Sequence, residues 1–109
     1  MDAEEIRNYV LEKDEVTETF PFGEGVLVFK KSEKIFLLLS LKDERMSINL
    51  KCDPDRAVEL REEFPEIIIP GYHMNKTHWN TVFPEVLKKD LVIRMIDDSY
   101  DLVNRKKTK

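Results

Sequence analysis

The sequence predicts a two-layer α+β fold, in which an antiparallel sheet packs one face against helices. Apolar residues recur at helical spacing near both ends of the chain and in its middle. Between these stretches, three strand-like segments with short polar connections lie within residues 26–51, and one or two more lie within residues 67–83. The predicted order is therefore helix, three strands, helix, one or two strands, helix. With 109 residues, of which 41% are hydrophobic and 37% charged, we expect one domain spanning residues 1–109.

The first helix is predicted from Asp2 to Lys13. Asp2 is a good N-cap, and acidic residues in the first turn favour the positive end of the helix dipole. The apolar residues that share one face of this helix are Ala3, Ile6, Tyr9 and Val10. Residues 20–25 contain two glycines, so we expect them to turn the chain into the first strand.

Three central strands are predicted at residues 26–30, 35–41 and 45–51, as an antiparallel meander. The third strand alternates cleanly between apolar and polar side chains. Its inward residues are Met46, Ile48 and Leu50, and its outward residues are Ser47, Asn49 and Lys51.

The second strand departs from alternation, because residues 35–39 are all apolar. We expect Ile35, Leu37, Leu39 and Leu41 to face the helices, which leaves Phe36 and Leu38 on the opposite face. Two explanations remain open for that second apolar face. Either a loop or the last helix folds over it, or it binds a protein partner or a second copy of the chain.

The second half of the chain begins with a helix after Asp53 and Pro54, which suit the N-cap and the first helical position. Pro65 ends this helix. Residues 67–69 and 78–83 are strand-like, and we expect Pro70-Gly71 to occupy the centre of a type II turn. The last helix is predicted from Pro84 to about Arg105, with a broad buried stripe.

Composition indicates a soluble cytoplasmic protein. Cys52 is the only cysteine, which excludes an internal disulfide and suits a reducing compartment. The longest apolar run, residues 35–39, is far too short to cross a membrane, and the acidic amino end does not resemble a secretory signal. The formal net charge is -4, so contact with a nucleic acid would need a local basic patch.

No catalytic or metal-binding motif is present. The sequence has no nucleophile elbow, no phosphate-binding glycine loop and no dinucleotide fingerprint. His73 and His78 are five residues apart, which is not the spacing of a helical ligand pair. We therefore expect a protein that is not an enzyme and has no metal, no cofactor and no small-molecule substrate.

The segment from Pro70 to Val82 is the candidate binding region. It contains both histidines and the only tryptophan, and it has no acidic residue. A lysine neutralises phosphates, asparagines bond phosphates or base edges, and aromatic rings stack on bases. The candidate nucleic-acid-binding residues are His73, Asn75, Lys76, His78, Trp79 and Asn80. In the competing interpretation, Trp79 and Val82 belong to the core, and the histidine and the asparagines hold a turn.

This segment resembles the signature of the YjbR/MmcQ family of bacterial proteins. The resemblance lies in residues 70–76, Pro-Gly-Tyr-His-Met-Asn-Lys, and in residues 78–82, His-Trp-Asn-Thr-Val. Further motifs agree at Phe20-Pro21-Phe22-Gly23, at Asn49-Leu50-Lys51-Cys52-Asp53-Pro54 and at residues 97–103, so the resemblance covers nearly the whole chain.

The resemblance implies a fold similar to the bacterial frataxin homologue and to type III secretion chaperones, and family members are often labelled DNA-binding. The expected function is thus a non-enzymatic binding domain that contacts DNA through Pro70–Val82. The alternative is a protein-interaction or chaperone-like module, or a homodimer, that uses the apolar outer sheet face around Phe36 and Leu38.

Overall fold

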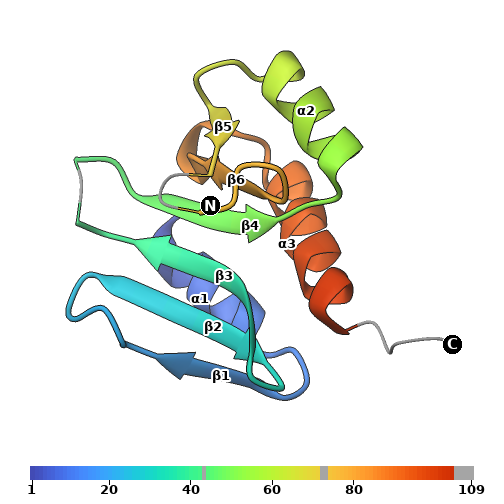
Figure 1. The fold of residues 1–109 in the computed structure, drawn as a ribbon. Coiled ribbons are helices and arrows are strands. Elements are labelled where there is room, and N and C mark those ends of the chain that lie inside the picture. The colour runs from blue at the N-terminus through green and yellow to red at the C-terminus, as the bar shows by residue number, and fades with distance from the viewer. Residues whose placement is uncertain (43, 72–73, 105–109) are drawn as a thin grey trace, which may run out of the picture.

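The computed structural model describes residues 1–42, 44–71 and 74–104 (Figure 1). Its sheet is antiparallel and has six strands in the order β1-β2-β3-β4-β6-β5. The helices are α1 (Ala3–Leu11), α2 (Pro54–Glu63) and α3 (Lys89–Asn104), with a 3-10 turn, η1 (Pro84–Val86), before α3. The strands are β1 (Val16–Thr19), β2 (Val26–Lys31), β3 (Lys34–Ser40), β4 (Ser47–Lys51), β5 (Ile68–Pro70) and β6 (Trp79–Val82). The predicted α+β class and the order of its elements are confirmed.

The helices cover one face of the sheet, which we call the inner face (Figure 1). The core between the two layers includes Ile6 and Val10 of α1, Leu60 of α2 and Ile96 of α3, packed on strand residues such as Ile48. The opposite face, which we call the outer face, has no helix over it in the described residues.

One strand was not predicted. Val16–Thr19 forms β1, an edge strand paired with β2. Its three β-branched residues suit an extended backbone, but the segment is short and carries no apolar alternation beyond Val16. Glu18 points to the inner side, where the Arg7 guanidinium of α1 donates two hydrogen bonds to its carboxylate at 2.6 and 2.9 Å.

The outward orientation predicted for Phe36 is wrong. A β-bulge between β2 and β3 pairs Phe29 with Leu37 and Lys30 with Ile35, so Phe36 is the extra residue. Its ring is fully buried on the inner face, edge-on to Tyr100 of α3 with 5.4 Å between ring centroids. The bulge reverses the alternation on its amino-terminal side, so Ile35 lies with Lys30 on the outer face.

The carboxyl half of β3 follows the predicted alternation. Leu37 and Leu39 lie in the core, and Leu38 lies on the outer face opposite Asn49 of β4. Leu41, predicted to face inward, follows the end of the strand and is exposed. In β4, the predicted inward and outward residues from Ser47 to Lys51 are confirmed by the register and by the core positions of Ile48 and Leu50.

The helix boundaries agree with the capping signals in part. Asp2 and Glu5 form a reciprocal capping box at the start of α1. Pro54 begins α2, although the Asp53 side chain makes no capping hydrogen bond. The predicted last helix is divided, since Pro84 begins the 3-10 turn and α3 starts only at Lys89. No helix among the described residues is long and apolar enough to cross a membrane.

Candidate binding site

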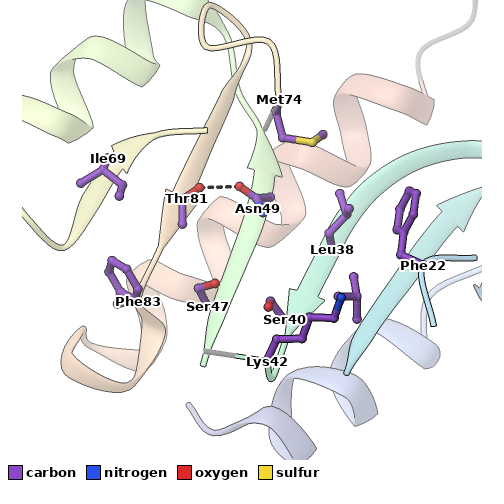
Figure 2. A pocket seen from close by; sticks show the side chains of 11 residues that line it. Phe22, Leu38, Ser40, Lys42, Ser47, Asn49, Ile69, Met74, Thr81 and Phe83 are labelled. Atoms are coloured by element: carbon purple, nitrogen blue, oxygen red, sulfur yellow. Dashed lines mark hydrogen bonds between the residues drawn. The ribbon is translucent and has the colours of Figure 1, made fainter. Parts of the chain in front are cut away.

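The outer face contains a hollow of about 710 Å³ (Figure 2). In Figure 2, Leu38, Asn49 and Thr81 lie between Phe22 at one end and Ile69 and Phe83 at the other. The described residues that line it are Phe22, Val26, Leu38, Ser40, Lys42, Ser47, Asn49, Ile69, Met74, Thr81 and Phe83. This volume lies in the range of small-molecule binding sites, about 300–1,000 Å³.

Strand register places the floor of the hollow. Ser40 pairs with Ser47, and Asn49 lies between Leu38 of β3 and Thr81 of β6. Because directly paired residues of antiparallel strands project to the same side, these five side chains emerge together. In the sheet, β6 lies between β4 and β5. Residues far apart in the sequence thus form one surface.

The polar groups of this floor are the Asn49 amide and the hydroxyls of Ser40, Ser47 and Thr81. Thr81 Oγ1 donates to Asn49 Oδ1 (Figure 2), and the Asn49 amide nitrogen has no hydrogen-bond partner among the described residues. Among the described residues, the hydroxyls of Ser40 and Ser47 have no hydrogen-bond partner. Ser47 is only 7% exposed, and it lines the hollow. A ligand in the hollow could bond its hydroxyl.

The walls of the hollow come from two loops. Phe22 is 58% exposed and precedes Gly23 and Gly25, both of which have positive φ angles. A Cβ on Gly25 would lie 2.9 Å from Lys42 Cγ, so this glycine lets the Lys42 stem cross the loop toward the hollow. At the other end, the Arg45 guanidinium lies 4.0 Å from the centre of the Phe83 ring.

Charge is unevenly divided between the two faces. The only acidic residue in the six strands is Glu18, which points to the inner face and pairs with Arg7. The register places Lys30 and Lys51 on the outer face, and Lys42 lines the hollow. The acidic side chains of α1, α2 and α3 lie in the other layer. The strand side chains on the outer face thus carry only positive charge, in a protein whose net charge is -4.

The predicted binding segment lies beside this hollow and is largely an exposed turn. Asn75, Lys76 and His78 are exposed. The Asn75 side chain accepts a hydrogen bond from the Thr77 amide at 2.8 Å, so it holds the turn, as the competing interpretation expected. The Arg61 guanidinium donates to the Lys76 carbonyl at 3.1 Å and ties the turn to α2.

Trp79 and Asn80 project to opposite faces. Trp79 is half-buried on the outer face, paired with Lys51. Asn80 is 2% exposed on the inner face, and its amide donates to the Ala57 carbonyl of α2 at 3.4 Å. The structure therefore does not bring the Asn80 side chain together with the other candidate residues. His73 lies outside the described residues.

The type II turn predicted at Pro70-Gly71 is wrong, and a close contact with the Trp79 backbone explains the glycine instead. Gly71 is not among the glycines with positive φ, which a type II turn would require at this position. Its amide donates to the Trp79 carbonyl at 2.8 Å, and a Cβ at Gly71 would lie 2.8 Å from Trp79 Cβ. Glycine is needed here because the backbone passes directly against Trp79.

Cys52 lies on the inner side, in a small cavity of about 10 Å³ shared with Asn80 and Asp98. Burial raises the pKa of the Cys52 thiol, and the nearby Asp98 carboxylate adds to the increase. Burial also raises the pKa of Asp98, with a further contribution from Asp101. A thiol with a raised pKa is a poor nucleophile at neutral pH. Within the described ranges, no group of three or more His, Cys, Asp or Glu side chains is arranged to hold a metal ion.

Sequence reasoning missed the loop residues Phe22 and Met74 and did not recognise the floor. The sequence signal for the floor was that Ser47 and Asn49 were predicted to face outward. Two small polar residues in a central strand indicate a sheet face that does not pack against the core. What the sequence could not show is that Thr81 of β6 lies directly beside Asn49.

Comparison with known proteins supports a single family. A family model described as YjbR matches residues 11–102. The uncharacterised protein YbdF of Escherichia coli O157:H7 is 41% identical over 101 residues, which cover 92% of this chain and 82% of that protein.

Two solved structures share the fold. A crystal structure of a Deinococcus radiodurans protein with the family-model domain DUF419 matches with a TM-score of 0.86 and 34% identity, over 97% of this chain and 80% of that one. A Pseudomonas syringae protein matches with a TM-score of 0.80 and 27% identity, over 94% of this chain and 99% of that one. The family model and the YbdF match together show that the chain belongs to the YjbR family.

Proposed function

We propose that this protein is a non-enzymatic domain that binds DNA across the outer face of its sheet and the adjoining turn at residues 74–78. The observation that carries the proposal is the charge division between the two layers. The outer face presents Lys30 and Lys51 with no acidic strand residue, and Lys76 is exposed beside it. A local patch of this kind supplies the phosphate contacts that the net charge alone would oppose.

Trp79 and His78 are the expected base contacts. Trp79 lies on the same face as Lys51, so a base stacked on its exposed part would place a neighbouring phosphate near that lysine. His78 is exposed at the start of β6. Asn80 has no part in this proposal because its side chain is buried against α2.

Charge reversal on the outer face tests the proposal. We expect the double variant Lys51→Glu/Lys76→Glu to lower the affinity for a fluorescein-labelled oligonucleotide about tenfold or more at ~50 mM salt, measured by anisotropy. The matched control is Lys88→Glu/Lys89→Glu, which makes the same change in net charge just before and at the start of α3. Equal losses in both pairs would show that only net charge matters, and would remove the outer face as the binding surface.

A second candidate function is a protein-interaction module, which Phe22 favours. Phe22 is 58% exposed and, with Leu38, gives the hollow an apolar edge. Phe36, on which this alternative also depended, is fully buried and takes no part. If the hollow joins two copies of the chain, sedimentation should detect a concentration-dependent dimer that Phe22→Glu abolishes, and oligonucleotides should not compete with it.

A further inference from the structure

We infer that the hollow on the outer face receives one unpaired nucleobase, so that the DNA bound by this protein is single-stranded. This inference rests on the proposed function and specifies its ligand. It is carried by the shape of the hollow, by its unsatisfied donors and by the cations at its edge.

The walls suit the flat apolar faces of a base. Phe22 and Met74 lie in loops at the edge of the hollow, with Leu38 between them (Figure 2). Val26, which pairs with Ser40, adds a further apolar side chain to the lining. A hollow of about 710 Å³ has room for a base together with its sugar. In a duplex both faces of each base are stacked and its pairing edge is occupied, so a paired base cannot reach the floor.

The floor suits an acceptor-rich base edge. The Asn49 amide nitrogen and the hydroxyls of Ser40 and Ser47 have no partner among the described residues, whereas Asn49 Oδ1 already accepts from Thr81. Among the described lining residues there is no carboxylate, so only the serine hydroxyls could accept from an exocyclic amine. Thymine offers two carbonyl oxygens to these donors and a methyl group to the apolar walls. We therefore expect thymine to be preferred to adenine.

Two cations are placed for the flanking phosphates. Lys42 lines the hollow, and Arg45 lies over the Phe83 ring, which also lines it. A base held on the floor leaves its phosphates at the rim, where these side chains are. An inserted neutral apolar group would not use either cation.

The test compares three labelled probes with the whole protein: a twelve-residue oligo(dT), an oligo(dA) of the same length and their duplex. In the wild type we expect oligo(dT) to bind about tenfold more tightly than the other two. Asn49→Leu, which keeps the side-chain volume, and Ser47→Ala should remove this preference. Asn8→Leu makes the same change on the exposed surface of α1 and should leave it intact.

The possible failures are distinguishable. If the duplex binds as tightly as oligo(dT) and binding still depends on Lys51 and Lys76, the proposed DNA binding stands and the inserted base is wrong. If oligo(dT) and oligo(dA) bind equally in the wild type, the donor floor does not select a base and the inference is overturned without any variant. If no probe binds at all, the proposed function itself falls.

Discussion

The Ser99 hydroxyl of α3 donates a hydrogen bond to the Phe36 carbonyl at 2.5 Å, and it accepts one from the Lys51 amide at 2.9 Å. The regular β3–β4 pairing ends at Leu37 and Leu50, so Phe36 and Lys51 would be the next pair. The hydroxyl bridges these two backbone groups. Ser99 is fully buried and thereby joins the helical layer to two strands of the sheet.

Removal of this bridge should be costly. Ser99→Ala leaves the Phe36 carbonyl and the Lys51 amide without their partner, which should lower the free energy of unfolding by about 2–4 kcal/mol. Urea denaturation measures the change. Asn8→Ala, on the exposed side of α1, should stay within about 0.5 kcal/mol of the wild type. A Ser99→Ala variant as stable as Asn8→Ala would show that the bridge has no role.

Gly71→Ala should act through Trp79. The added Cβ would lie 2.8 Å from Trp79 Cβ and 2.9 Å from its carbonyl oxygen, so β5 and β6 must move apart. We expect a loss of about 1–3 kcal/mol and a red shift in the emission of Trp79, the only tryptophan.

Gly23→Ala is the control for this glycine. Its φ is +87°, so alanine is strained there, but no atom lies within 4 Å of the added Cβ. Its emission should therefore match that of the wild type even if its stability falls. An unchanged Trp79 spectrum in Gly71→Ala would contradict the close approach described above.

The Cys52 thiol should make stability depend on pH at alkaline values. Because its pKa is raised in the folded protein, folding favours the protonated thiol. The resulting stabilisation is fully present below the ordinary thiol pKa of about 8.5 and is lost as pH rises through the raised folded value. Between pH 7 and pH 10, the free energy of unfolding should thus fall more for the wild type than for Cys52→Ala. Parallel declines in the two proteins would assign the pH dependence to other groups.

Alternation predicted the sheet well where the register is regular. In β4, polar and apolar residues alternate, and each of them projects as expected because β3 and β6 pair with it without interruption. In β3 the same rule failed at Phe36 and Ile35. All the residues around the bulge are apolar, so nothing in their order marks where the alternation reverses.

The candidate site also has one part that the sequence suggested and one part that it did not. Composition pointed to the turn around Lys76 and His78, because an acid-free cluster of aromatic and basic residues is visible in one stretch of sequence. Its role in binding stays a prediction. The hollow was not visible, since its floor joins Asn49 to Thr81 across 32 positions through a strand order that is not sequential. Asn80 is buried because side chains alternate along β6, so its side chain projects to the inner face while those of Trp79 and Thr81 project to the outer face.

The fluorescence of Trp79 during titration with oligo(dT) tests DNA binding at the outer face most directly. Trp79 is the only tryptophan and lies two residues from Thr81 on the same face of β6. We predict quenching that saturates at low salt and weakens at moderate salt, because bound DNA stacks beside Trp79 and releases counterions. Unchanged emission and unchanged anisotropy of labelled oligo(dT) up to about 100 μM protein would contradict DNA binding at this face.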